Sequence, residues 1–279
     1  MLAVPIYREC KKIRLTGNFN VDQNTMYKLV QNAAGVLRPL YMAMLLVVLK
    51  DKFKNVDESY IQMFKEIANS SGEFVRKAYI WFFVGMECRF RVFYFKDGSR
   101  KAEVFENLVQ KYVVDGIIQT DSYVVYRYAE GVFRIACLLH LRRGLLELAG
   151  LPDADRILGH LNKLFRLDAV HKVGEKEPDG HIWTEEEHKA YRATFAPQII
   201  DEMMADCRAI LASGKYLEHS PLYKAISLII SEEAAIRGIF TEAFTSLTNN
   251  TAYHNFSIIT NFNPEKALHS CLTGDTMCA

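Results

Sequence analysis

The run Ala78-Tyr-Ile-Trp-Phe-Phe-Val84 decides the fold. It is aromatic and β-branched, as is Phe90-Arg-Val-Phe-Tyr-Phe95, and Gly85-Met-Glu-Cys-Arg89 joins the two runs. Residues of this kind favour strands, and a short connection that contains glycine predicts a hairpin. Upstream, the alternating segment from Lys52 to Tyr60 predicts another strand, followed by a polar loop at residues 69–72. Together these segments predict an antiparallel meander.

Downstream of the hairpin, helical and strand patterns alternate. The segments are an amphipathic helix at 100–112, a buried strand at 117–121, a short helical piece at 123–129, a strand at 132–137 and a helix at 140–149. A meander that leads into βαβ crossovers predicts an α/β fold with one mixed sheet and flanking helices. This is the chain order of the ribonuclease H-like fold, although other α/β folds share it.

The segments on either side of this core are helical. Residues 7–15 and 22–50 predict two helices, the second capped by Asp22, and the pair fits either plain packing or the edge of a helix-turn-helix. Periodic segments at 156–167, 185–211 and 222–244 predict a helical insertion, interrupted by a polar loop at 174–180. The predicted domains are therefore an N-terminal helical segment (1–50), a core (51–150), a helical insertion (151–247) and a C-terminal part (248–279).

The composition is that of a globular protein with a full core. The 279 residues are 50% hydrophobic and 24% charged, and 15 glycines and 7 prolines are too few for a turn-rich β-sandwich of this size. Residues 1–150 hold 22 Lys and Arg against 15 Asp and Glu, whereas residues 151–279 hold 12 against 18. The first part is thus the candidate surface for a polyanion, unless this difference is ordinary scatter.

The sequence predicts a cytoplasmic protein without a membrane span. The longest continuous apolar run, residues 41–49, is far shorter than the roughly 20 residues that cross a bilayer. The N-terminus lacks the pattern of an export signal, and the six cysteines have no paired spacing. No phosphate-binding loop, dinucleotide fingerprint, serine-hydrolase elbow or His-Glu-x-x-His motif occurs, so nucleotide hydrolase, dehydrogenase and esterase functions have no motif support.

Two aspartates lie at the ends of predicted strands. Asp57 ends the first strand and Asp121 the fourth, and in a sheet of this order those strands are neighbours. Two carboxylates at adjacent strand ends can share Mg²⁺ or Mn²⁺, because these hard cations prefer oxygen ligands. An aspartate at a strand end is more often a solvated turn residue, so this spacing alone does not establish a metal site.

Several motifs resemble transposases of the insertion sequence 66 family, a bacterial group with a DDE-type catalytic domain of the ribonuclease H-like fold. They extend over almost the whole chain and are Pro5-Ile-Tyr-Arg8, Val56-Asp-Glu-Ser59, Tyr79-Ile-Trp81, Gln119-Thr-Asp-Ser-Tyr123, Cys137-Leu-Leu-His-Leu-Arg-Arg143 and Asn249-Asn-Thr-Ala252. The resemblance implies that Asp57 and Asp121 are catalytic metal ligands, that Glu58 assists from outside the ligand shell, and that two Mg²⁺ or Mn²⁺ ions act in the intact family. It also implies insertion-sequence ends and target DNA as partners, together with a homo-oligomer or a full-length transposase.

The third catalytic position departs from the family pattern. In the family, two residues follow the paired asparagines and the catalytic glutamate comes next. Here Asn249-Asn-Thr-Ala252 is followed by Tyr253, so residues 248–279 are a remnant of the third motif. A phenol with an ordinary pKa of ~10 is neutral at pH 7 and does not replace a carboxylate on Mg²⁺. Glu232, Glu233 and Glu242 lie upstream, and nothing in the sequence assigns them to the site.

The segment from Cys137 to Arg143 allows two further interpretations. Cys137 and His140 could begin a zinc site with His171, His181 or His188, but a buried cysteine with a packed histidine is the preferred interpretation. Arg142 and Arg143 could contact DNA phosphates or simply solvate their helix.

Three functions fit these observations. The first is a DNA transposase with impaired cut and strand-transfer chemistry, and the second is a non-catalytic relic that binds DNA or a full-length partner. The third is an enzyme on the same fold that does not act on DNA.

Overall fold

The structure is a computed structural model that describes residues 6–17, 20–68, 74–96, 98–112, 116–123, 126, 132–242 and 245–249. The chain forms two compact units. The first comprises Met1–Gly116, Tyr128–Gly131 and Asn250–Ala279, and the second comprises Ile117–Arg127 and Val132–Asn249. Each unit is described by itself below.

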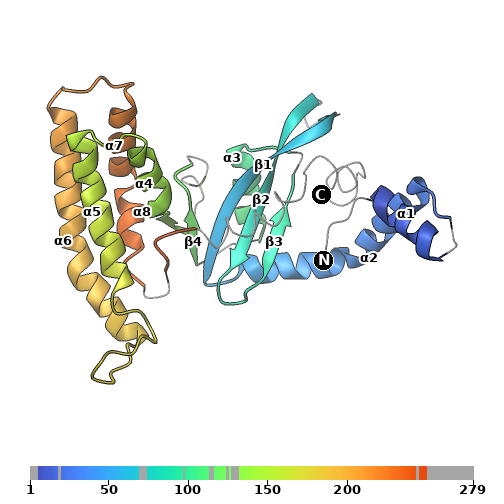
Figure 1. Cartoon of the computed structure of the whole chain (residues 1–279), viewed down its shortest axis with the longest axis horizontal. Coiled ribbons are helices and arrows are strands. Elements are labelled where there is room, and N and C mark those ends of the chain that lie inside the picture. The colour runs from blue at the N-terminus through green and yellow to red at the C-terminus, as the bar shows by residue number, and fades with distance from the viewer. Residues whose placement is uncertain are drawn as a thin grey trace. The chain divides into compact units, whose positions relative to one another are not determined.

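The first unit contains the predicted meander. Its elements are α1 (Ile6–Gly17), α2 (Gln23–Leu49), β1 (Phe53–Ala68), β2 (Phe74–Gly85), β3 (Arg91–Tyr94) and α3 (Ala102–Tyr112). β1 pairs antiparallel with β2, and β2 pairs antiparallel with β3, so the predicted strands and hairpin are confirmed (Figure 1). β1 is longer than predicted because its second part, to Ala68, pairs with the start of β2 after a register shift between Gln62 and Ile67. The predicted loop at 69–72 lies outside the described residues.

Strand register separates the two faces of the meander. Glu58 is paired with Trp81, whose ring stacks on Phe105 of α3 at a centroid distance of 5.8 Å. Asp57 is paired with Phe82, whose ring contacts that of Phe93 at 4.7 Å. Neighbouring residues of a strand point to opposite faces. Glu58 therefore lies on the face that α3 covers, and Asp57 lies on the other face.

α2 begins at the predicted cap. The Asp22 side chain accepts a hydrogen bond from the backbone N–H of Thr25, and the Tyr41 hydroxyl donates to the carbonyl of Phe93 in β3. By length and composition α2 could cross a membrane, and 17% of its most apolar window is buried. The sequence analysis did not predict a helix of membrane-spanning length here, because polar residues interrupt the apolar ones along α2. Such a helix, standing alone, is weak evidence for a membrane span.

In the described residues of the second unit, two strands are combined with five helices. These are β4 (Ile117–Thr120), β5 (Phe133–Ala136), α4 (Leu138–Leu146), α5 (Pro152–Ala169), α6 (Glu185–Ala212), α7 (Pro221–Ser231) and α8 (Glu233–Gly238). β4 and β5 pair in parallel, as the predicted crossover requires. The predicted helical piece at 123–129 lies mostly outside the described residues. With antiparallel pairs in the first unit and a parallel pair in the second, the predicted α/β class with mixed strand pairing is confirmed.

The helices of the second unit follow the predicted insertion with one correction. Figure 1 shows α5 and α6 side by side, and α6 begins with a capping box between Thr184 and Glu187. The single helix predicted for 222–244 is wrong, because the chain breaks at Glu232 into α7 and α8. The Glu232 side chain is fully buried at this break and pairs with Arg134 of β5.

Candidate active site

Asp57 is half-buried and lies in the first half of β1, not at a strand end as predicted, because β1 continues to Ala68. Its Oδ1 atom accepts a hydrogen bond of 2.9 Å from the backbone N–H of Glu58, which fixes the orientation of the carboxylate. Strand pairing on the β2 side holds the backbone of Asp57 opposite Phe82. The side chain is therefore an oxygen donor on a rigid strand.

The Glu58 side chain has a different partner on the opposite face. Its Oε1 atom accepts hydrogen bonds from Nε and Nη2 of Arg100 at 2.9 and 2.5 Å, and the guanidinium of Arg100 lies over the ring of Tyr79. The Glu58 side chain is 1% exposed and that of Arg100 is 38% exposed. Glu58 thus contacts Asp57 through its backbone N–H, while its carboxylate joins β1 to the segment before α3.

Asp121 directly follows β4 in the second unit. Its Oδ1 atom accepts a hydrogen bond of 2.9 Å from the backbone N–H of Tyr123, so the carboxylate closes a local turn. The hydroxyl of Thr120 donates to the carbonyl of Asp121. Like Asp57, Asp121 is a half-buried carboxylate whose direction is set by a backbone N–H.

A buried ion pair supports the backbone of Asp121. Arg134 in β5 donates from Nη2 to Oε2 of Glu232 at 2.6 Å, and from Nη1 to the carbonyl of Asp121 at 3.4 Å. The Arg134 side chain is 14% exposed, and that of Glu232 is 0% exposed. A charged side chain that has so little contact with water is stabilised by the opposite charge of its partner. Glu232, one of the three upstream glutamates, is therefore linked to Asp121 through one guanidinium.

The start of the third motif is fixed to the end of the parallel strand pair. The side-chain amide of Gln119 donates to the carbonyls of Ala136 and Ser246, the backbone N–H of Leu138 donates to the carbonyl of Leu247, and the backbone N–H of Asn249 donates to the sulfur of Cys137. The bond from Gln119 to Ala136 joins β4 to β5, and the other three join the segment 246–249 to β4 or to the start of α4. The chain thus enters the third motif beside the strand that precedes Asp121. Tyr253 lies outside the described residues.

The zinc hypothesis involves residues that have other partners. Cys137 is buried and accepts the hydrogen bond from Asn249, whereas His171 is bonded to Glu177, His181 pairs with Glu187, and His188 bonds the carbonyl of His171. Among the described residues, no three His, Cys, Asp or Glu side chains group as metal ligands. The geometry therefore gives a zinc site at this segment no support.

The two candidate DNA-binding arginines differ in their surroundings. Both lie in α4, where Arg142 is half-buried and donates from Nε to the side-chain oxygen of Asn162 in α5 at 3.1 Å. Arg143 is exposed. The guanidinium of Arg142 is therefore partly used in packing, whereas that of Arg143 faces solvent.

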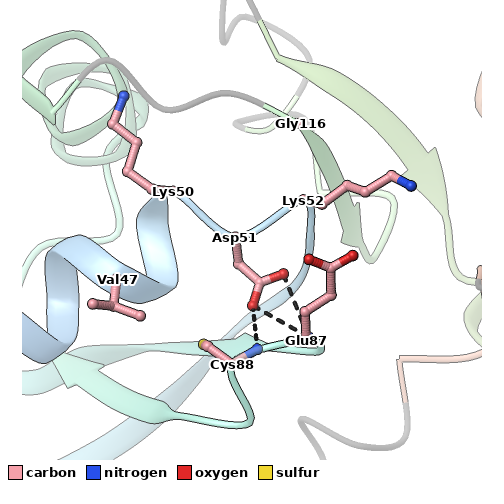
Figure 2. Close-up of a pocket in the computed structure, with 7 residues that line it drawn as sticks. All are labelled: Val47, Lys50, Asp51, Lys52, Glu87, Cys88 and Gly116. Atoms are coloured by element: carbon pink, nitrogen blue, oxygen red, sulfur yellow. Dashed lines mark hydrogen bonds between the residues drawn. The ribbon is translucent and has the colours of Figure 1, made fainter.

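A pocket in the first unit surrounds a carboxylate that serves the fold. Figure 2 shows Asp51 pointing at the backbone of Glu87 and Cys88, with Lys50 and Lys52 directed away from it. Asp51 accepts hydrogen bonds from the N–H groups of Cys88 at 2.8 Å, Glu87 at 3.2 Å and Phe53 at 3.1 Å. Burial alone raises the pKa of Asp51, but the hydrogen bonds from Cys88, Phe53 and Glu87 outweigh it and bring the pKa below its ordinary value. The pocket is thus the corner where α2, β1 and the β2–β3 turn are tied together.

Comparison with known proteins assigns the family. The family described as "Transposase IS66 family" matches residues 1–255, which include the Asp57 and Asp121 motifs. The chain belongs to the IS66 transposase family. Family membership and the mixed strand pairing together confirm the predicted ribonuclease H-like fold.

A solved structure is also similar to this member of the IS66 transposase family. No curated protein matches the sequence. A chain from the "Drosophila P element transposase strand transfer complex" is similar, with a TM-score of 0.48 and 10% identity, over 86% of this chain and 82% of that chain.

The donor chemistry of the IS66 motifs fits a hard divalent cation. Asp57 and Asp121 both offer carboxylate oxygens, and each accepts a hydrogen bond from a backbone N–H. Sequence analysis missed the supports of this arrangement, namely Arg100, Arg134 and Gln119. Arg134 had a detectable signal, since a charged residue inside the apolar run Val132–Cys137 requires a buried partner.

Proposed function

We propose that this chain is a DNA-binding transposase in which Asp57 and Asp121 together hold a divalent cation, Mg²⁺ or Mn²⁺, and that the loss of the third carboxylate at Tyr253 impairs strand cleavage. The supporting observation is that a transposase family matches residues 1–255, while both of its aspartate motifs are intact and both carboxylates are fixed by backbone N–H groups. Two oriented carboxylates are the minimum set for a shared hard cation.

The residues of the chain would divide the work as follows. When bound, the divalent cation supplies an activated water and stabilises the leaving oxygen in phosphodiester cleavage. Asp57 and Asp121 would hold it, and Arg134 would keep the backbone of Asp121 in place through the bond to its carbonyl. The substrates would be the ends of the insertion sequence and then target DNA, which the freed 3′ hydroxyl attacks. The cell compartment would be the bacterial cytoplasm.

DNA would be bound first through its phosphates. Exposed basic residues of the first unit lie on one face of α1, at the i, i+3 and i+4 positions Arg8, Lys11 and Lys12. Arg143 of α4 is a further exposed cation. Contacts of this type release counterions, so affinity should fall steeply as salt rises.

The second candidate function is a non-catalytic relic that binds DNA or a full-length transposase. Tyr253 favours it, because a neutral phenol is a poor Mg²⁺ ligand and leaves the site one carboxylate short. The intact Asp57 and Asp121 favour retained chemistry. An enzyme on the same fold that acts on another substrate would bind the cation but show no affinity for DNA.

A nicking assay separates these functions. Purified protein is incubated with supercoiled plasmid and with a labelled duplex carrying the insertion-sequence end, in Mn²⁺ and in Mg²⁺. Nicking that is abolished by Asp121→Asn, but is kept by Glu218→Gln at an exposed carboxylate of the second unit, supports the enzyme. A gel shift without nicking supports the relic. In that case Tyr253→Glu is the informative variant, because restored nicking identifies the third ligand as the missing part.

A further inference from the structure

Arg192 of α6 is a fully buried cation in the helical insertion. Its exposed fraction is 0%, and this burial lowers the pKa of the guanidinium, an effect that the charge of Asp168 partly offsets. Asp168 of α5 lies 3.3 Å from Nη1 of Arg192. An arginine stays charged at every physiological pH, so its burial destabilises a protein unless hydrogen bonds and an opposite charge compensate. The remaining N–H donors of Arg192 therefore require acceptors within the protein.

These acceptors lie on the chain that leaves the insertion after α8. Nη2 of Arg192 donates to the carbonyl of Ile239 at 2.5 Å, and Nη1 donates to the carbonyl of Thr245 at 2.9 Å. Nη2 also donates to the hydroxyl of Thr245 at 3.2 Å, and the guanidinium lies over the ring of Phe240 at 5.1 Å. Ile239 directly follows α8, and Thr245 directly precedes the segment 246–249. One side chain of α6 thus holds both ends of the connection between α8 and the third motif.

The segment 246–249 has a second anchor at the strands. Gln119 of β4 donates to the carbonyl of Ser246 at 2.6 Å, and the backbone N–H of Asn249 donates to the sulfur of Cys137 at 3.2 Å. Leu247 and Asn249 are buried. The segment is therefore held by α6 on the insertion side, and by β4 and the start of α4 on the strand side.

The shape of the guanidinium suits this task. Residues 245–249 belong to no helix or strand, so contacts from outside the segment must offset the conformational entropy that its ordered backbone loses. A guanidinium is planar and carries five N–H donors, so it can bond two backbone carbonyls at once in fixed directions. The ammonium group of a lysine is a point charge on a flexible stem. Arg192 thus holds the connection through its geometry as well as its charge.

We infer that Arg192 is a positioning residue of the third motif, because its bonds to Ile239 and Thr245 bring the segment 246–249 to the strand that precedes Asp121. The inference rests on the proposed function, since it gives the helical insertion the task of presenting the third motif to the Asp121 side of the site. The alternative role for Arg192 is general stabilisation of the insertion. The two roles differ in what is lost when Arg192 is replaced.

Two buried cysteines of the second unit report these losses separately. Cys137 contacts the segment through the bond from Asn249 and is 1% exposed. Cys207 lies in α6 and is 0% exposed. A buried thiol is inert, and its reaction requires access of the reagent to the sulfur. Release of the segment alone should therefore expose Cys137 and leave Cys207 protected, whereas opening of the insertion should expose Cys207.

Labelling of the full chain with N-ethylmaleimide, read by peptide mass spectrometry, tests the inference. Arg192→Met removes the guanidinium, and Arg192→Lys keeps the charge without the planar fork. Arg208→Met is the matched control, because Arg208 is an exposed arginine of the same helix. We expect Cys137 to react at least tenfold faster in both Arg192 variants than in the native chain, with Cys207 unchanged. The control should label as the native chain does.

Mn²⁺ binding then connects the segment to the proposed chemistry. Tyr253→Glu adds the carboxylate that the third motif lacks, and under the proposed function it should raise Mn²⁺ affinity at least tenfold. We expect Arg192→Lys to abolish this gain and Arg208→Met to keep it. If Tyr253→Glu gives no gain in the native background, the proposed function fails at its third ligand, whereas the labelling of Cys137 still decides whether Arg192 holds the segment.

Three results would overturn the inference. One is unchanged labelling of Cys137 in both Arg192 variants, which would show that the strand side alone holds the segment. Another is equal exposure of Cys137 and Cys207 in both variants, which would make Arg192 a general stabiliser of the insertion. The third is a gain in Mn²⁺ affinity from Tyr253→Glu that persists in Arg192→Lys.

Discussion

Replacement of Arg134 by methionine should destabilise the second unit strongly. Methionine keeps much of the side-chain volume but leaves the fully buried carboxylate of Glu232 without the guanidinium that bonds it at 2.6 Å. Removal of one partner from a buried ion pair costs about 3–5 kcal/mol. For a unit of this size, such a loss corresponds to a fall in melting temperature of roughly 6–20 °C.

The double variant Arg134→Met/Glu232→Leu distinguishes a lost ion pair from lost packing. Because apolar residues of similar volume often replace a buried pair without loss, the double variant should recover most of the stability, to within about 1–2 kcal/mol of the native chain. The matched control is Arg237→Met, which removes the more exposed pairs with Glu233 and Asp201 and should cost less than about 1 kcal/mol.

Urea unfolding followed by circular dichroism gives these free energies. If Arg134→Met costs no more than Arg237→Met, or if the double variant is as unstable as Arg134→Met alone, the reasoning about the buried pair is refuted.

Three further predictions concern other parts of the scaffold. Asp51→Asn should cost about 1–3 kcal/mol in urea unfolding at pH 7, because the amide presents an N–H group to the N–H of Cys88. The pKa of Asp51 is lower in the folded protein than in the unfolded chain, so its contribution to the free energy of unfolding is complete above the unfolded pKa of ~4 and is lost as pH falls through the folded pKa. The difference in stability between the native chain and Asp51→Asn should therefore shrink below pH 4. A difference that stays constant with pH would contradict this. Thr184→Ala removes the capping box with Glu187 and should cost about 1 kcal/mol in thermal unfolding, whereas Thr184→Ser should be near neutral. Burial raises the pKa of Cys207 to about 12, so this thiol should resist alkylation by iodoacetamide in the folded protein at pH 8 and react on unfolding, as mass spectrometry of the peptide would show.

The strands of the first unit could be predicted because their residues carry a strong local signal. Aromatic and β-branched residues dominate β2 and β3, and no competing helical period exists there. The second half of β1 could not be predicted in this way. Residues such as Met63, Lys65 and Glu66 are good helix formers, and they lie in the strand because the residues on either side of them, to Gln62 and from Ile67, pair with β2, which is a tertiary effect.

The break between α7 and α8 could not be predicted either, because it coincides with a contact between distant segments. The apolar period continues from Leu222 through Phe240, so the sequence reads as one helix. The partner of Glu232 is Arg134, 98 positions away in the chain, and a local pattern contains no information about such a pair.

In the candidate site, too, only the residues with a local signal could be predicted from the sequence. Asp57 and Asp121 were identified because their motifs are local and resemble those of a family. The residues that orient or support them, including Arg100, Arg134 and Gln119, act through contacts between distant segments. The binding of Gln119 to Ser246, for example, spans 127 positions.

The shared-cation claim is tested most directly by Mn²⁺ binding, measured by electron paramagnetic resonance titration of the full chain. We expect Asp57→Asn and Asp121→Asn each to weaken one Mn²⁺ site at least tenfold, with the double variant little worse than either, because two ligands of one ion act as a unit. Glu218→Gln should bind as the native chain does. Mn²⁺ affinity that is unchanged in both single variants, or two independent sites that each lose one aspartate, would contradict the account.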